Sequence, residues 1–171
     1  MMQQENIVDF INAPKIFYQR LRCENVLAKA HFESQKRIFE VLSHLFESEN
    51  ANLNSDDIYE GFYAREQIGS TALGKGVVLP HCSLATTETI EVAVLTLQEP
   101  IIDEATDMPA DIFIGLVFPE QQPAAQSFIA QLIHFIKQDA VLQSVRDAET
   151  NEALIDALQL TQSDWRMGIF G

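Results

Sequence analysis

The feature that most constrains the fold is an apolar run from Ile112 to Phe118. A strand with one exposed face alternates apolar and polar residues, whereas a strand covered on both faces does not. We therefore expect a central strand here, buried between two layers. The rest of the chain predicts strands near 77–79 and 90–97, and helices at 34–49, 55–64, 124–138 (extended or restarted at 141–146) and 150–158. This order favours an α/β fold, a three-layer α/β/α domain with a small mixed β-sheet flanked by helices.

Capping and turn residues predict where these elements begin and end. Three hydroxyl residues are expected to cap helix N-termini, namely Ser34, Ser55 and Thr150. Pro80 should end the strand that precedes it or sit on a sheet edge, and Pro100 should end its strand, because proline cannot donate a hydrogen bond to a neighbouring strand. An acidic loop is expected over residues 103–109.

The chain has 171 residues, of which 47% are hydrophobic and 21% charged, as is ordinary for one globular domain. We predict a single domain over residues 1–160 and a C-terminal tail over residues 161–171, which holds Trp165. Its two cysteines, Cys23 and Cys82, do not suggest a disulfide framework.

The formal net charge is −14. An acidic surface repels phosphate backbones and anionic lipids, so we expect no nucleic-acid partner. No apolar run approaches the roughly 20 residues that span a bilayer, and the N-terminus lacks the basic-then-apolar pattern of a secretory signal. A cytoplasmic location without direct membrane insertion is the expectation.

The reactive groups of the chain are concentrated in one segment, Arg65 to Cys82, with the sequence REQIGSTALGKGVVLPHC. His81 follows the short strand at 77–79, and Ser70 and Thr71 supply hydroxyl donors. Glycines that let a backbone turn and approach a ligand stand at three positions: Gly69, Gly74 and Gly76. Backbone N–H groups, hydroxyls and the cation of Arg65 around an imidazole are what a phosphoryl group requires.

This segment resembles the active-site segment of the bacterial phosphotransferase-system EIIA proteins of the fructose/mannitol type, and more narrowly the nitrogen-regulatory EIIA proteins. The shared pattern is R-E-x-x-G-S-T-x-x-G-x-G-x-x-x-P-H followed by a small residue, a position that Cys82 takes here. The resemblance extends from about Glu24 to Leu158, and it implies a first strand near residues 23–30. It implies that a phosphocarrier protein of the HPr class phosphorylates His81, and that neither a metal nor a cofactor takes part.

The resemblance also implies roles for the residues around His81. Arg65 would offset the charge of the phosphoryl group, whose oxygens would be held by Gly69, Ser70, Thr71, Gly74, Gly76 and Gln126. A plainer alternative stays open for several of them. Ser70 and Thr71 would then cap a turn, Arg65 would pair with Glu66, and Lys75 would be a solvated loop residue.

One departure from the family concerns the helix after the last core strand, where relatives commonly carry a second histidine. The region reads Ala124-Ala125-Gln126-Ser127 here. Gln126 is our candidate to donate an amide hydrogen bond to the phosphoryl group instead, since His134 lies about two helical turns further along. The departure bears on onward transfer of the phosphate more than on phosphorylation itself.

Three functions remain open at this point. The first is a regulatory phosphoacceptor of the nitrogen phosphotransferase system, which controls target proteins such as kinases or transporters through its phosphorylation state. The second is a sugar-specific EIIA protein that passes phosphate to an EIIB protein. The third is a binding module of the same fold that has lost phosphotransfer. The sequence leaves the oligomeric state open.

Overall fold

The computed structural model describes residues 13–47 and 52–166, with side chains described as far as residue 159. Six strands form one mixed sheet: β1 (Val26–Ala30), β2 (Ala72–Gly74), β3 (Val77–Val78), β4 (His81–Leu84), β5 (Glu91–Asp103) and β6 (Met108–Pro119). The sheet order is β1-β5-β6-β3-β2, and β4 also pairs with β6. Pairs β1–β5, β3–β6 and β4–β6 are parallel, while β5–β6 and β2–β3 are antiparallel.

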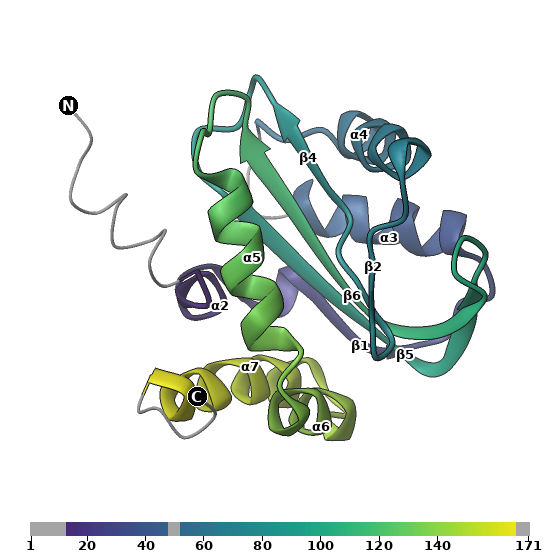
Figure 1. The fold of residues 1–171 in the computed structure, drawn as a ribbon, viewed down its shortest axis with the longest axis vertical. Coiled ribbons are helices and arrows are strands. Elements are labelled where there is room, and N and C mark those ends of the chain that lie inside the picture. Colours follow the sequence, from purple (N-terminus) through teal and green to yellow (C-terminus); the bar gives the residue numbers. More distant parts are fainter. Residues whose placement is uncertain (1–12, 48–51, 167–171) are drawn as a thin grey trace.

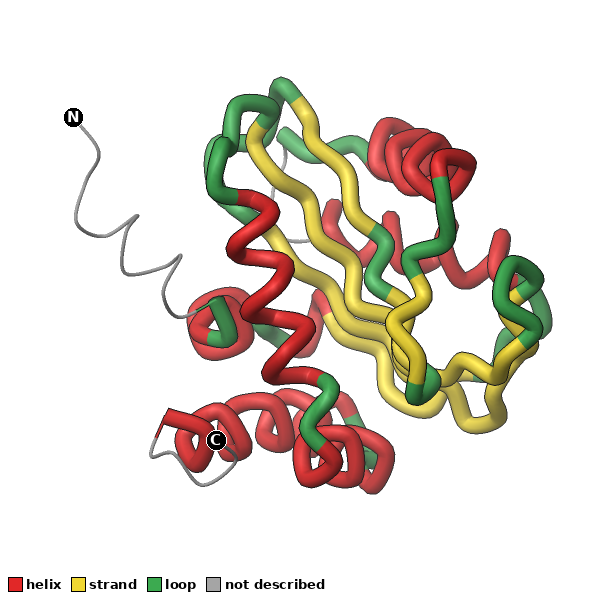
Figure 2. Tube along the Cα trace, viewed as in Figure 1, coloured by secondary structure: helices red, strands yellow, loops and turns green. Residues whose placement is uncertain are grey.

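Helices cover both faces of this sheet (Figures 1 and 2). One face carries α3 (Gln35–Glu47) and α4 (Ser55–Ile68). The other face carries α5 (Ala125–Ile136), and three further helices lie on the same side: α2 (Lys15–Arg20), α6 (Asp139–Asp147) and α7 (Asn151–Arg166). A short 3-10 helix, η1 (Cys23–Asn25), leads into β1. The predicted three-layer α/β/α architecture is confirmed.

The central strand β6 shows why the run at 112–118 contains no polar side chain. Ile112, Ile114 and Leu116 belong to the apolar cluster on the α5 side. Phe113 and Val117, which alternate with them, belong to the cluster on the α3–α4 side. Both sets are fully buried, so the strand must be apolar on both faces.

Helix α4 differs from the prediction at both ends. Asn54 is its N-cap, because the Asn54 side chain accepts hydrogen bonds from the backbone N–H groups of Asp56 and Asp57. The expectation of a Ser55 cap is therefore wrong, whereas Ser34 and Thr150 do cap α3 and α7. The C-terminus of the helix lies at Ile68 rather than near Ala64, since no helix-breaking residue stands between Ala64 and Gly69. The helix therefore includes Arg65 and Glu66 in its last turns.

The two prolines affect their strands differently. Strand β3 ends at Val78, before Pro80, as predicted, because proline cannot donate a hydrogen bond to β6. The Pro80 carbonyl accepts the Leu116 N–H, and a further strand, β4, begins at His81. Strand β5 continues past Pro100, which lies in a register shift of the β5–β6 pair, where no ladder bond is required of it. The expected acidic loop is consequently reduced to the tight turn of a long β5–β6 hairpin.

Two further predictions concern the C-terminal half. The segment at 141–146 is a separate helix, α6, because the backbone is extended at Gln138 between α5 and α6. Helix α7 continues past residue 160, where we placed the domain boundary, and the side chain of Trp165 lies outside the described residues. Within the described ranges, no helix combines the length and the apolar character that a membrane crossing requires.

Candidate functional site

His81 is the first residue of β4 and pairs with Leu116 of the central strand. The His81 Nδ1 atom lies 2.8 Å from the backbone carbonyl oxygen of Leu79. A carbonyl oxygen can only accept, so Nδ1 carries the proton and donates it. The other ring nitrogen, Nε2, then holds the lone pair, and the half-buried ring is partly open to solvent. The backbone thus leaves Nε2 as the ring nitrogen with a free lone pair.

Burial lowers the pKa of His81 below its ordinary value, because desolvation disfavours the charged ring. The guanidinium of Arg65 acts in the same direction, whereas the hydrogen bond to Leu79 and the carboxylate of Glu66 raise the pKa. The imidazole is therefore neutral near physiological pH, which is the protonation state that a nucleophile needs.

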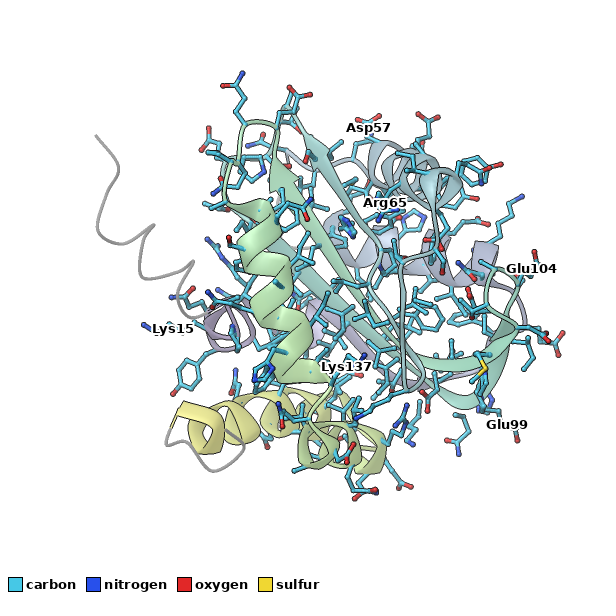
Figure 3. The ribbon with its side chains drawn as sticks, viewed as in Figure 1. Lys15, Asp57, Arg65, Glu99, Glu104 and Lys137 are labelled. Atoms are coloured by element: carbon cyan, nitrogen blue, oxygen red, sulfur yellow. The ribbon has the colours of Figure 1, made fainter. Side chains whose placement is uncertain are left out.

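Arg65 lies in the last turns of α4 (Figure 3). It is close enough to His81 for its charge to act on the ring. Its Nη1 atom donates to the carbonyl oxygen of Gly69 at 2.8 Å. This bond caps the C-terminus of the helix, where carbonyl groups lack partners and a cation is favourable. The structure thus shows a cap in place of the alternative ion pair with Glu66, and it holds the cation beside the imidazole.

Glu66 binds the turn that follows α4. Its Oε1 atom accepts the backbone N–H of Thr71 at 3.1 Å, and its Oε2 atom accepts the Thr71 hydroxyl at 2.6 Å. Ser70 in turn accepts the N–H of Ala72 through its side-chain oxygen. Both donors of Thr71 are therefore engaged, which favours the turn-capping alternative for that residue. The role of Gly69 and Ser70 as phosphoryl ligands stays a prediction.

Gly61 is a site residue that sequence reasoning missed. A Cβ atom at this position would lie 2.7 Å from both Cβ and Sγ of Cys82, so α4 and β4 are in close contact here. The contact determines how near α4 brings Arg65 to His81. A glycine in a helix interior lowers the stability of the helix by about 1 kcal/mol relative to alanine. A glycine inside the helical pattern at 55–64 was therefore the sequence signal of close packing.

Cys82 is a packing residue rather than a second nucleophile. Its side chain lies under α4, and burial raises the pKa of its thiol to about 12. The reactive thiolate is therefore not formed at physiological pH.

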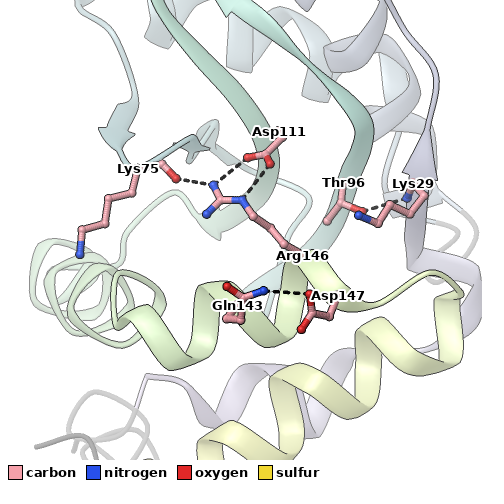
Figure 4. A network of polar contacts seen from close by, with 7 residues as sticks. All are labelled: Lys29, Lys75, Thr96, Asp111, Gln143, Arg146 and Asp147. Atoms are coloured by element: carbon pink, nitrogen blue, oxygen red, sulfur yellow. Dashed lines mark hydrogen bonds and ion pairs between the residues drawn. The ribbon is translucent and has the colours of Figure 1, made fainter.

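The hairpin between β2 and β3 forms a second polar cluster (Figure 4). Arg146 of α6 forms two hydrogen bonds with the carboxylate of Asp111, each 2.8 Å long, and also donates to the carbonyl oxygen of Lys75. A Cβ atom at Gly76 would lie within 2.6 Å of both side chains. Lys75 binds Asp139 and the carbonyl of Lys137. The cluster joins the sheet to the α5–α6 junction.

The structure does not bring Gly74 and Gly76 to His81. Gly76 directly precedes Val77, which pairs with Ile112 of β6, whereas His81 pairs with Leu116 of the same strand β6. Four residues of strand correspond to about 13 Å. In Figure 3, Lys137, whose Nζ lies near Gly74, is correspondingly far from Arg65. These two glycines belong to the second cluster.

Gln126 lies exposed in the first turn of α5, the helix that packs on the sheet face opposite α4. No hydrogen bond joins it to His81 in the described part of the chain. Its role as a phosphoryl ligand stays a prediction. His134 is exposed in the last turn of the same helix, at its far end.

Comparison with known proteins gives results at three levels. Residues 19–160 match the family model described as "Phosphoenolpyruvate-dependent sugar phosphotransferase system, EIIA 2". A nitrogen regulatory protein of Pseudomonas aeruginosa is 32% identical over 123 residues, which is 71% of this chain and 80% of that protein. The nitrogen regulatory protein of Escherichia coli K12 is 27% identical over 145 residues, covering 83% of this chain and 88% of that protein.

The solved structures agree with this. The nitrogen regulatory protein IIA-Ntr from Neisseria meningitidis superposes with a TM-score of 0.73 at 27% identity, covering 82% of this chain and 97% of that one. The mannitol IIA protein of Escherichia coli shares the fold, with a TM-score of 0.66 at 14% identity, over 81% of this chain and 99% of that one. The chain therefore belongs to the EIIA 2 family of the phosphoenolpyruvate-dependent sugar phosphotransferase system.

Proposed function

We propose that this protein is a regulatory EIIA protein of the nitrogen branch, which accepts a phosphoryl group on Nε2 of His81. The observation that carries the proposal is the 2.8 Å bond between His81 Nδ1 and the Leu79 carbonyl, since it leaves Nε2 unprotonated. The donor would be the phosphohistidine of a phosphocarrier protein of the HPr class. The phosphorylation state would then change which target proteins the chain binds in the cytoplasm.

The chemical step is an in-line displacement at phosphorus. The lone pair of His81 Nε2 forms a new N–P bond while the N–P bond of the donor breaks, and that electron pair returns to the donor imidazole. Such a reaction depends on positioning and on charge stabilisation. The bond to Leu79 orients the ring, and it stabilises the positive charge that develops when Nε2 attacks. Arg65 lies where its guanidinium can offset the charge of the transferred group.

The assignment to the nitrogen branch is supported by the relatives named nitrogen regulatory proteins, two of which exceed 30% identity. The sugar-transport alternative has one specific observation in its favour. The 2-O-α-mannosyl-D-glycerate-specific EIIABC component of Escherichia coli is 27% identical over 133 residues, although these make up only 20% of its length. The mannitol IIA protein, which shares the fold, has been solved in complex with phosphorylated enzyme IIB.

A labelling experiment tests phosphorylation. The protein is incubated with radiolabelled phosphoenolpyruvate, enzyme I and a phosphocarrier protein, and acid-labile label is measured. We expect His81→Ala to abolish the label, and His134→Ala to leave it unchanged, because His134 is an exposed histidine far from the site. Phosphorus–nitrogen NMR couplings of the labelled protein should place the bond at Nε2. Absence of label in the wild type would leave only the phosphotransfer-inactive binding module.

A chase with EIIB separates regulation from transport. We expect the label to stay on the protein when EIIB proteins of the fructose and mannitol type are added. Rapid transfer of the label to an EIIB cysteine would contradict the regulatory assignment and establish the sugar-transport alternative.

A further inference from the structure

A groove of about 530 Å³ lies between the N-terminus of α3, the outer face of α4 and the β5–β6 hairpin. His81, Arg65 and Ser70 do not line it, so it is separate from the surface on which a phosphoryl donor must meet the imidazole. The groove does include Glu66, the residue that binds Thr71. It therefore adjoins the His81 site without being part of it.

The groove exposes apolar groups that the fold itself does not bury. Tyr63 on α4 is 54% exposed and Ile102 on the hairpin is 57% exposed, and both line it. The rings of Tyr59 and Tyr63 stack at a centroid distance of 6.4 Å with an interplanar angle of 21°, so two aromatic side chains are neighbours on this face of α4. Phe39 of α3 lies buried at the base. Aromatic and aliphatic side chains gathered in a concave surface are typical of protein–protein contact sites.

The polar groups that line the groove are mainly acidic. Four carboxylates line it, from Glu33, Glu66, Asp103 and Glu104, against one cation, Lys36. Asp103 is only 2% exposed, and its Oδ1 atom has no hydrogen-bond partner. Glu104 stands on the hairpin turn at the outer rim (Figure 3). A groove with this charge attracts a basic occupant and opposes an acidic one.

We propose that this groove is a docking site for a basic segment of a partner protein, one that combines arginine or lysine with apolar side chains. Apolar side chains of the segment would pack on Tyr63 and Ile102, and its cations would pair with the carboxylates. A second copy of the chain is a poor occupant, because it carries the same −14 charge and would oppose carboxylates to carboxylates.

Glu66 connects the docking site to the His81 site, because it lines the groove and also binds the turn that follows α4. Glu66 has one carboxylate, and its two oxygens accept the two hydrogens of Thr71. A cation of the partner that pairs with Glu66 competes with Thr71 for these oxygens. Docking would therefore loosen the turn that lies beside His81. This link rests on the proposed function, whereas the docking itself does not require phosphorylation.

The test uses the full unphosphorylated chain and three synthetic peptides of equal length, built from arginine and leucine, arginine and serine, or glutamate and leucine. Binding is followed in amide NMR spectra. We expect saturable shifts with the arginine–leucine peptide, concentrated at Tyr59, Tyr63 and Ile102 and including the Thr71 amide. The arginine–serine peptide should bind about tenfold more weakly, because it has no apolar side chains to pack in the groove. The glutamate–leucine peptide should not bind.

Matched variants locate the site. Tyr63→Ala and Glu104→Lys should each weaken binding of the arginine–leucine peptide, by about tenfold for the aromatic residue. Tyr18→Ala and Glu120→Lys change the same residue types at exposed positions outside the groove and should bind as the wild type does. All four positions are exposed, so the spectra will show whether the fold is kept.

Three results would overturn the proposal. The first is peptide-induced NMR shifts that spread over the acidic surface and do not saturate. The second is an equal loss of peptide affinity in the groove variants and the control variants. The third is shifts of groove residues that depend on protein concentration without peptide, which would identify a second copy as the occupant. Because no phosphoryl donor is present, none of these results bears on phosphorylation of His81. The labelling experiment decides that separately.

Discussion

The middle of the Arg65–Cys82 segment performs a different task from its two termini. The termini supply Arg65 and Glu66 on one side and His81 on the other, and these residues lie together, with Nδ1 of His81 bonded to the Leu79 carbonyl. The middle supplies Gly74–Gly76, which lie about 13 Å away along the sheet, where Gly76 contacts Arg146 and Asp111. The comparison teaches that one contiguous motif can combine a candidate reactive site with the structural contacts that hold its scaffold.

The sharpest way to separate the middle of the segment from its termini is Gly76→Ala. Gly76 has φ +84°, and a Cβ atom there would displace the Arg146–Asp111 pair. We expect the free energy of unfolding to fall by about 2–4 kcal/mol, measured by urea denaturation. Gly69→Ala is the control, because Gly69 has φ 170° and open space around it, and its stability should change little. The folded fraction of Gly76→Ala should still accept phosphate, and a specific loss of labelling would show that the middle of the segment also serves the His81 site.

A change at the contact between Gly61 and Cys82 tests how Arg65 is positioned relative to His81. Gly61→Ala should lower the free energy of unfolding by about 1–2 kcal/mol, since the clash with Cys82 outweighs the gain in helix propensity. It should also slow phosphorylation by about tenfold, because α4 carries Arg65 away from His81. Replacing Cys82 with glycine in the same chain removes the clash and should restore both properties. A double variant no better than the single one would show that the contact does not set the position of α4.

Glu66→Gln tests the electrostatics of His81. Glu66 raises the pKa of His81, so its removal should lower that pKa further, as measured by NMR titration of the ring. One of the two bonds to Thr71 is lost as well, which should cost about 1 kcal/mol of stability. Arg65→Gln should shift the pKa in the opposite direction. Equal pKa values in the wild type and in both variants would mean that neither charge acts on the ring.

The lowered pKa of His81 also predicts a sign for stability against pH. The folded protein binds a proton on this ring more weakly than the unfolded chain, whose histidines titrate near about 6.5. The contribution of His81 is therefore present above that pH and lost as the pH falls below it. Comparing wild type with His81→Ala by urea denaturation at several pH values isolates the effect. A contribution that grew as the pH fell would contradict the geometry described.

The smallest expected effect is that of Lys75→Ala. Its ion pair with Asp139 is exposed, so we expect a loss of about 0–0.5 kcal/mol and unchanged labelling. Slower phosphorylation of this variant would show that the lysine of the glycine-rich turn does reach the transferred group after all.

The sequence predicted the architecture well because burial leaves a direct pattern in residue type. The apolar run at 112–118 marked the central strand, and Ser34 and Thr150 marked two helix starts. It succeeded at Pro80, where β3 ends, and failed at Pro100, because that proline lies where the sheet requires no hydrogen bond from it, and the pairing that decides this is distant in sequence. It also ended α4 too early, although the Arg65–Gly69 cap that closes the helix is a local contact between residues four apart.

By itself, the sequence indicated His81 as the candidate reactive residue and indicated the family to which the chain belongs, because both depend on residue types at fixed spacing. Only the tertiary structure decided which nitrogen of that ring is free, which of the glycines lie near it, and that Glu66 stands between the site and an acidic groove. These depend on distances between strands and helices far apart in the chain. Such distances arise from packing, which leaves no local pattern.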